Sequence, residues 1–404
     1  MRVVRNLESL EKILVKARES KNTVQDKVCK IVKDVKENGD AALAEYTKKF
    51  DKVRISAKEF RVSESEISAA FNELDSSLIS AFKTAIDNVT KFYKEQIPKT
   101  KRVKSENGKT LISRYMPLER VGVYVPAGTA PLVSSVYMSV IPALTAGVKE
   151  IVLVSPPCKD KYINPFILAV ASLLKIREIY RLGGAQVIAA LAYGTKTIKK
   201  VDKIVGPGNE FVTEAKRQVF GFVDIDMLAG PSEVVILASG GTKIEHVIAD
   251  LEAQTEHHNG IGIVITNSHK IIRELRKTKV NGYALRVKNL DEAAKAANLV
   301  APEHLEILTK KPHLVLKNIK NAGAIFLGEW TPVALGDYTA GPSHVLPTGG
   351  SSKFFSCLSV KDFLKETHII SYTKKALQEE VQVLEKIAAL EGMTKHIESV
   401  KKRL

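Results

Sequence analysis

Short apolar runs typical of β-strands alternate with helix-like segments over most of the chain, and this alternation constrains the fold more than any other feature. A first series has such runs at 121–125, 151–154, 178–182 and 203–205, and a second series begins at 233–237. Strands that alternate with helices of about 10–15 residues form βαβ units around a parallel sheet. We therefore expect an α/β fold with two doubly wound, Rossmann-like modules.

The chain has 404 residues, which is enough for two to three domains. Apolar residues at helical spacing indicate a helical N-terminal region over 1–118, which we expect to pack with the second module. Pro98 and the basic residues after it predict a connector. The two modules should span 119–232 and 233–365, and an extended C-terminal tail should follow over 366–404.

The formal net charge is +16, which is compatible with nucleic acid, an anionic membrane or anionic small molecules as partners. The basic residues are scattered and accompany no nucleic-acid-binding motif, so neither nucleic acid nor membrane is expected as the main partner. No apolar run reaches the roughly 20 residues that a membrane span needs. The three cysteines lie far apart and form no C-x-x-C pair, which favours a reducing, cytoplasmic location.

Glycine-rich turns follow several predicted strands, although the Gly-x-Gly-x-x-Gly motif of a dinucleotide-binding turn is missing. Gly183-Gly184-Ala-Gln186 and Gly206-Pro-Gly-Asn209 each begin a predicted helix. Backbone amides at such a helix start can bind a phosphate or an amide-bearing ligand. Glycine also permits a tight turn without any ligand, so both interpretations stay open.

Two polar residues continue or adjoin the apolar stripe of a predicted helix over 243–257. Gln254 lies three residues after Leu251 on that stripe, and His257 lies three residues further on. This spacing lets both side chains point at one metal ion. A histidine at a helix C-terminus is also stabilised by the helix dipole, so the spacing alone does not assign a metal site.

Further polar residues cluster in turns and near the chain end. Glu303 and His304 place a carboxylate beside an imidazole, a pair that can serve two successive proton transfers. Asp337 lies in a loop rich in turn-forming residues, where it is either a ligand or a turn-stabilising group. Glu391 and His396 repeat the combination of carboxylate and imidazole close to the C-terminus.

Several blocks of this sequence resemble the histidinol dehydrogenase family. They occur in the same order between about residues 120 and 396. The blocks are Tyr124-Val-Pro-Ala-Gly-Thr-Ala-Pro131, Gly183-Gly-Ala-Gln186, Gly206-Pro-Gly-Asn-Glu-Phe-Val-Thr-Glu-Ala-Lys216, Ala229-Gly-Pro-Ser-Glu233, Ala301-Pro-Glu-His-Leu-Glu306, Gly336-Asp-Tyr338 and His344-Val-Leu-Pro-Thr348.

The resemblance implies a cytoplasmic enzyme that oxidises L-histidinol to L-histidine through the aldehyde, with two NAD and one zinc ion per site. It assigns NAD binding to the first module and the zinc ligands and catalytic pair to the second. It also implies a homodimer in which the tail of one chain completes the site of its partner. By position, the implied zinc ligands are Gln254, His257, Asp337 and His396.

The same resemblance implies that Glu303 and His304 transfer protons and that NAD contacts Tyr124, Gln186 and Asn209. The implied substrate contacts are Ser232, Gln254, His257, His304, Asp337, Glu391 and His396. Two other functions are weighed against this one. The first is a related zinc- and NAD-dependent dehydrogenase for another small amino or diol alcohol, and the second is a basic scaffold that binds nucleic acid.

Overall fold

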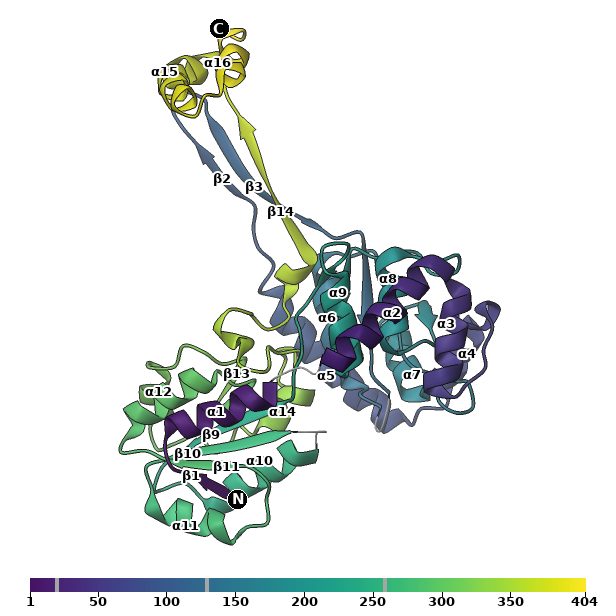
Figure 1. Ribbon diagram of the computed structural model, residues 1–404, viewed down its shortest axis with the longest axis vertical. Coiled ribbons are helices and arrows are strands. Elements are labelled where there is room, and N and C mark those ends of the chain that lie inside the picture. The colour runs from purple at the N-terminus through teal and green to yellow at the C-terminus, as the bar shows by residue number, and fades with distance from the viewer. Residues whose placement is uncertain (19–21, 128–130, 257–259) are drawn as a thin grey trace.

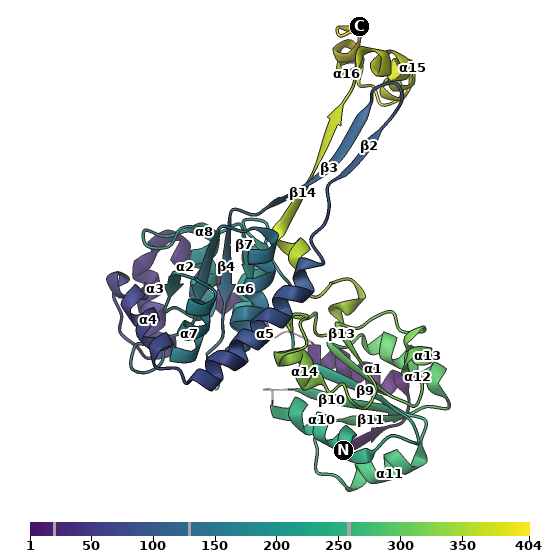
Figure 2. The ribbon, with the colours of Figure 1, turned by 180° about the vertical axis from the view of Figure 1, so that it is seen from behind.

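The computed structural model describes residues 1–18, 22–127, 131–256 and 260–404. It consists of two α/β modules that lie side by side and a slender arm that projects away from them (Figures 1 and 2). The first module has a five-stranded sheet and the second a six-stranded sheet. The predicted α/β fold with two doubly wound modules is therefore confirmed.

The first module is built on a parallel sheet with the strand order β6-β5-β4-β7-β8. Its strands are β4 (Arg120–Tyr124), β5 (Glu150–Val154), β6 (Glu178–Tyr180), β7 (Lys203–Val205) and β8 (Asp224–Ile225). The first strand, β4, lies at the centre of the sheet. Strands β5 and β6 are added on one side of it, and β7 and β8 on the other. This reversal between β4 and β7 is the topological switch point at which such sheets bind ligands, outside the carboxyl ends of the strands.

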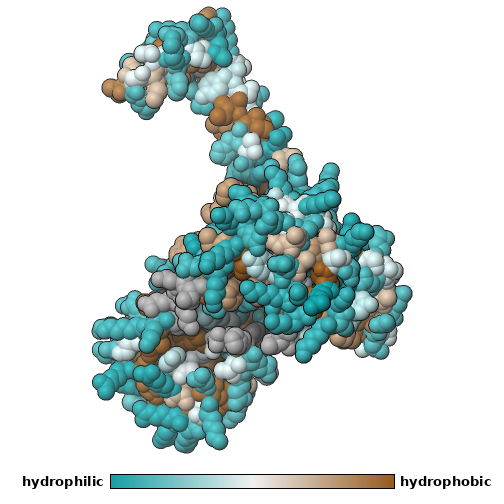
Figure 3. All heavy atoms as spheres, turned by 45° about the vertical axis from the view of Figure 1, so that its right-hand side comes forward, coloured by the Kyte–Doolittle hydropathy of each residue, from teal (hydrophilic) through white to brown (hydrophobic). Residues whose placement is uncertain are grey.

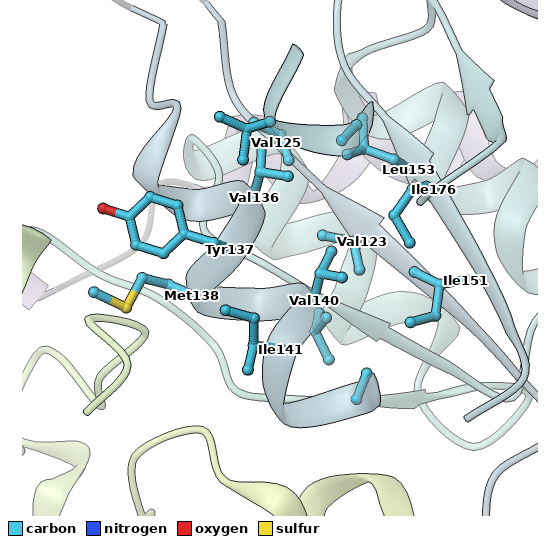
Figure 4. Packing of buried hydrophobic residues seen from close by; sticks show 14 of the residues in the cluster. Val123, Val125, Val136, Tyr137, Met138, Val140, Ile141, Ile151, Leu153 and Ile176 are labelled. Carbon is cyan, nitrogen blue, oxygen red and sulfur yellow. The ribbon is translucent and has the colours of Figure 1, made fainter. Parts of the chain in front are cut away.

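Helices cover both faces of this sheet. One face carries α4 (Glu64–Asn72), α5 (Ser76–Lys94), α6 (Ser134–Ala146) and α7 (Pro165–Leu173), and its apolar contacts are drawn in Figure 4. The other face carries α2 (Asn22–Asn38), α3 (Asp40–Tyr46), α8 (Gly184–Tyr193) and α9 (Glu210–Val219), with the short turns η1 (Thr47–Asp51) and η2 (Ala57–Glu59) beside them.

The second module repeats this strand order and adds the N-terminal strand at one edge, which gives β1-β11-β10-β9-β12-β13, all parallel. Its strands are β1 (Arg2–Val4), β9 (Glu233–Ala238), β10 (Ile261–Thr266), β11 (Tyr283–Arg286), β12 (His304–Leu308) and β13 (Ala324–Leu327). Helices α1 (Leu7–Arg18), α12 (Leu290–Val300) and α13 (Pro312–Leu316) pack on one face, and α10 (Ile244–Glu256) and α11 (His269–Lys277) on the other. A short helix α14 (Val333–Tyr338) and the turns η3 (Ser351–Lys353) and η4 (Val360–Phe363) follow.

The expectation that residues 1–118 pack with the second module is wrong for most of that region. Only β1 and α1 join the second module, whereas α2, α4 and α5 pack on helices of the first. The reason lies in α8, whose side chains from Ala185 to Ala192 are all buried. A helix that is apolar on every side needs cover on its outer face, and α2 provides it.

The arm is a three-stranded antiparallel sheet capped by two helices (Figure 1). Its elements are β2 (Lys101–Lys104), β3 (Thr110–Pro117), β14 (Leu364–Ser371), α15 (Lys374–Leu390) and α16 (Thr394–Lys401). The basic segment after Pro98 is thus a strand and not the predicted connector. All four residues of β2 are exposed, and an edge strand rich in lysine has no apolar alternation by which to recognise it.

Within the described ranges, we find no helix that is both long and apolar enough to cross a membrane. Cys29, Cys158 and Cys357 are all free thiols.

Candidate active site

A cavity of about 180 Å³ lies between the two modules. The first module contributes Leu132, Ser134, Ser135, Gly206, Pro207, Gly208, Lys216, Asp226 and Met227 to its lining, and later parts of the chain contribute Ala229, Gly230, Ser232, Glu303, His304, Asp337, Tyr338, His344, Val345, Leu346 and Thr348. The predicted catalytic pair, Glu303 and His304, and two other candidate site residues, Ser232 and Asp337, therefore line the same cavity.

The two sheets face this cavity with opposite ends of their strands. Gly206 to Gly208 directly follow β7, at the carboxyl edge of the first sheet. Ser232 directly precedes β9, and His304 is the first residue of β12, so both lie at the amino edge of the second sheet. Strands β9 and β12 are neighbours in that sheet, which brings the two positions together although they are 72 residues apart.

Glu303 is held by two hydrogen bonds from the start of the neighbouring strand. Its Oε2 accepts from the Ser232 hydroxyl at 2.5 Å and from the backbone amide of Glu233 at 3.1 Å. The side chain is about 10% exposed, so the carboxylate exchanges most of its water for these donors. Such donors stabilise the ionised carboxylate and fix its direction.

His304 lies between two carboxylates. Its Nδ1 is 3.7 Å from Oε2 of Glu303, and its Nε2 is 3.9 Å from Oδ1 of Asp337. The imidazole is about 5% exposed and packs at a tilt against Phe326, with ring centroids 6.0 Å apart. A buried imidazole flanked by two carboxylates can take up a proton and hold the resulting charge.

Gln254 reaches the same cluster from the last turn of α10. The side chain is buried, and its Nε2 donates to the Ser232 hydroxyl at 2.9 Å. Gln254, Ser232 and Glu303 thus form one chain of hydrogen bonds. This bond uses the amide nitrogen of Gln254 and leaves its oxygen as the atom suited to a cation. His257, the predicted partner of Gln254 at a metal ion, lies outside the described residues.

Asp337 is the penultimate residue of α14, and two contacts fix the end of that helix. The His344 ring lies 3.0 Å from the backbone oxygen of Asp337 through Nδ1, and 3.2 Å from the Ser135 hydroxyl through Nε2. The Tyr137 hydroxyl donates to the backbone oxygen of Tyr338 at 2.9 Å. Ser135 and Tyr137 both belong to α6 of the first module. The end of α14 is therefore linked to that module indirectly through the His344 ring and directly through Tyr137.

The three residues with an implied NAD contact lie at the carboxyl edge of the first sheet. Tyr124 ends β4, Gln186 lies in the first turn of α8, and the Asn209 side chain caps α9 by accepting from two backbone amides. The Tyr124 hydroxyl accepts from the amide of Gly184 at 3.3 Å. Burial raises the pKa of Tyr124 to about 12, which keeps the phenol neutral.

The side-chain amide of Gln186 has no hydrogen-bond partner in the described ranges. Its side chain is 1% exposed, and within those ranges neither Oε1 nor Nε2 meets a hydrogen-bond partner. An unpaired amide is costly to bury. A ligand with donor and acceptor groups would satisfy this side chain.

Sequence reasoning missed a buried ion pair that shapes the glycine-rich turn beside the cavity. Lys216 donates both to the Asp226 carboxylate and, at 3.0 Å, to the backbone oxygen of Gly206. Asp226 in turn accepts from the amide of Gly206 at 2.8 Å. Gly206 has φ of +112°, and a Cβ there would collide with the backbone oxygen of Tyr124, so the turn requires glycine. The spacing of lysine and aspartate gave no signal for this pair.

Glu391 and His396 do not reach the cavity of their own chain. Both line a hollow of about 620 Å³ on the arm, together with Tyr372, Leu377, Glu380, Val381, Val383, Leu384, Ile387 and Ala388. Both ribbon views place α15 and α16 at the far end of the arm (Figures 1 and 2). Apolar side chains are exposed there, including Ile370, Leu390 and Val383, and the arm carries visible apolar patches (Figure 3).

No group of three histidine, cysteine or acidic side chains within metal-binding reach occurs in the parts of the chain that are described. The donors near the cavity are an amide, Gln254, which bonds to Ser232, and a carboxylate, Asp337, whose Oδ1 is 3.9 Å from Nε2 of His304. Zinc accepts carboxylate and imidazole donors, usually four in all. Gln254 and Asp337 therefore fit part of a zinc site, and further ligands would have to come from outside the described part of this cavity.

Comparison with known proteins identifies close relatives over the whole length. The family model for histidinol dehydrogenase matches residues 14–404. Histidinol dehydrogenase of Clostridium acetobutylicum is 46% identical over 393 residues, covering 92% of this chain and 90% of the relative. That of Carboxydothermus hydrogenoformans is 41% identical and covers 100% of this chain and 99% of the relative. The crystal structure of histidinol dehydrogenase from Elizabethkingia anophelis has a TM-score of 0.93 at 35% identity, covering 100% of this chain and 98% of that chain.

Proposed function

Since this chain belongs to the histidinol dehydrogenase family, an oxidoreductase family of histidine biosynthesis, we propose that it oxidises L-histidinol to L-histidine in the cavity between its two modules. The observation that carries this proposal is the Glu303–His304 pair, which is buried, hydrogen-bonded to Ser232 and adjacent to Asp337. The family implies NAD as the oxidant. Zinc, the individual roles of residues and the dimer are parts of the proposal.

The zinc ligands are Gln254, His257 and Asp337 of one chain and His396 of another. The Gln254 oxygen and the Asp337 carboxylate are supported by their approach to one cluster from two elements, α10 and α14. When bound, zinc supplies a fixed position for the imidazole and amine of the substrate, and NAD supplies the hydride acceptor.

His304 is the base of the first oxidation. It takes the proton that the alcohol loses as the carbon gives up its hydride, and the flanking Glu303 and Asp337 carboxylates stabilise the imidazolium. Glu303 is the base of the second oxidation. It accepts a proton from the water that adds to the aldehyde carbon, and Ser232 keeps its carboxylate oriented toward the substrate.

NAD binds at the carboxyl edge of the first sheet, beside Tyr124, Gln186 and Asn209. Two observations support this placement. The edge contains the topological switch point between β4 and β7, and the side chain of Gln186 is buried with no hydrogen-bond partner in the described ranges. The Gly206–Gly208 turn links this edge to the cavity that holds His304.

The enzyme is a homodimer in which the arm of each chain supplies Glu391 and His396 to the site of its partner. The exposed apolar face of the arm supports this, because a slender projection with side chains such as Leu390, 89% exposed, requires a cover. Glu391 pairs with the ammonium group of the substrate. The three free thiols favour a cytoplasmic location.

The decisive experiment measures NADH formation spectrophotometrically with purified protein, L-histidinol and NAD, before and after zinc removal by a chelator. We expect two NADH per L-histidinol, loss of the activity with the chelator and recovery with zinc. A panel of other small amino alcohols and diols serves as the control. One NADH per substrate, or faster oxidation of another alcohol, would contradict the proposal.

A further inference from the structure

Glu306 is a carboxylic acid in the middle of an apolar sheet face. It belongs to β12, is fully buried and lies two residues after His304, on the same face of the strand. In the parallel register it lies beside Ile236, and the flanking pairs on that face place Val234 beside His304 and Ala238 beside Leu308. Burying a charged carboxylate at such a position costs free energy unless the group is paired or neutral. The contacts of each Glu306 oxygen therefore need an explanation.

One oxygen of Glu306 has a defined partner. Oε1 accepts a hydrogen bond of 3.1 Å from the backbone amide of Val333. Val333 is the first residue of α14, so its amide has no partner inside the helix. The Glu306 side chain therefore connects the strand that begins with His304 to the helix that carries Asp337.

The other oxygen faces a second carboxyl group. Oε2 is buried and meets no hydrogen-bond donor in the described part of the chain, and its neighbour is Asp250 of α10. Burial, followed by the nearby Asp250 charge, raises the pKa of Glu306 well above its ordinary value. Burial also raises the pKa of Asp250, against smaller opposing effects of a hydrogen bond with Glu306 and of His246. Glu306 is fully buried and Asp250 is partly buried, so the two adjacent carboxyl groups hold at least one proton between them, because ionising both is costly.

A protonated Glu306 satisfies both of its neighbours. Its hydroxyl donates to the Asp250 carboxylate, while its carbonyl oxygen accepts from the Val333 amide. The arrangement extends from α10 through β12 to α14, and so joins the two elements that carry Gln254 and Asp337.

We propose that Glu306, together with Asp250, is a positioning residue that fixes the start of α14 and thereby holds the Asp337 carboxylate at the metal site. The inference rests on the proposed role of Asp337 as a zinc ligand. The far end of α14 is anchored separately by Tyr137. Gly336 lies so close to the Phe326 ring that an added Cβ would be 2.7 Å from it, which leaves the helix little room to shift sideways. Glu306 then determines where the helix begins.

Zinc affinity of the purified, full-length protein tests this, measured by competition with a chromophoric chelator in the absence of substrate and NAD. Glu306→Leu replaces the carboxyl group with an apolar side chain and removes both hydrogen bonds. We expect its zinc Kd to rise about 10- to 100-fold, as for other groups that orient a ligand. Removing one partner of a buried hydrogen-bonded pair lowers stability, so urea unfolding is measured on the same samples to establish that the variant is folded under the conditions of the zinc titration.

Glu306→Gln is the matched control, because its amide can still accept from Val333 and donate to Asp250. It should bind zinc within about threefold of the parent protein, on the scale of weak single contacts. A second variant, Val333→Pro, removes the backbone donor and leaves the Glu306 side chain in place. Proline suits this position, since Pro332 before it already has an extended backbone and Val333 is the first helical residue. Val333→Pro should weaken zinc binding as Glu306→Leu does.

Asp337→Ala separates the two hypotheses. If Asp337→Ala binds zinc as tightly as the parent, the proposed ligand set fails. If Asp337→Ala loses zinc while Glu306→Leu and Val333→Pro keep it, only the positioning role fails. If Glu306→Leu does not fold, Val333→Pro still decides the question. Equal weakening in Glu306→Gln and Glu306→Leu would also overturn the inference, because it would show that the hydrogen bonds are not what matters.

Discussion

The hydroxyl of Tyr137 donates a hydrogen bond of 2.9 Å to the backbone oxygen of Tyr338, and this contact joins the two modules at the edge of the candidate active site. Tyr137 belongs to α6 in the first module, and Tyr338 is the residue after Asp337 at the end of α14. Because the cavity lies between the modules, its width depends on contacts of this kind. The module that we propose for NAD is thereby tied to α14, the helix that carries the proposed zinc ligand Asp337.

Removing this hydroxyl should therefore affect both stability and catalysis. We expect Tyr137→Phe to lower the free energy of unfolding by about 1 kcal/mol, the usual contribution of one hydrogen bond. It should also lower kcat/KM, because Asp337 loses a nearby anchor. Urea unfolding and steady-state NADH formation measure the two effects. Tyr162→Phe, at a side chain that is 55% exposed, is the control and should change neither.

Mutations of the proposed catalytic pair, Glu303 and His304, should lower turnover without removing the metal. We expect His304→Asn and Glu303→Gln each to lower turnover by about 10²–10⁴-fold, the typical contribution of a positioned acid or base. Zinc content, measured by atomic absorption, should stay at the parent level, because neither residue is a proposed ligand. In Glu303→Gln, a rapid first NADH followed by a slow second is expected in stopped-flow traces. Parental rates in both variants would remove the assignment.

The sequence pattern predicted the α/β class and the two doubly wound modules. Apolar runs at strand spacing predicted β4, β5 and β9 close to their observed bounds, because each is buried on both faces and reads as a continuous apolar segment. The exposed strand β2 was missed, because no apolar pattern marks an edge strand made of basic residues.

The candidate site was predictable only through the family resemblance. General rules place ligands at the carboxyl ends of parallel strands, yet Ser232 and His304 lie at the amino end of the second sheet. Residue types and spacing alone also left Gln254 and Asp337 with ordinary structural explanations. Lys216 and Asp226 act on a turn through tertiary contacts, for which the local sequence contains no signal.

Asp51 should make stability depend on pH. Burial raises the pKa of Asp51 from its ordinary value of 3.8 to about 6, and its Oδ2 meets no hydrogen-bond partner among the described residues. The folded state therefore binds a proton that the unfolded state has lost between about pH 4 and pH 6, so this group's contribution to stability falls as the pH rises through that range. We expect Asp51→Asn to raise the free energy of unfolding at pH 8, by about 3 kcal/mol at most, and to change it little at pH 4. Asp160→Asn, on an exposed turn, is the control.

The proposed dimer, in which each arm serves the partner's cavity, predicts that two inactive variants restore activity when their subunits are mixed. His304→Asn keeps an intact arm, and His396→Ala keeps an intact cavity, which should lack zinc when tested alone. In a mixed dimer, the arm of the first chain would complete the cavity of the second, so one of the two sites is fully intact. Random reassortment after gentle denaturation and refolding should recover about a quarter of the parental rate, because about half of the dimers are mixed and each has one working site. If each arm served its own chain, every site in the mixture would carry one defect and no activity would return. As a control, each variant is denatured and refolded alone. Any activity that returns in this control does not come from exchange of subunits between the two variants.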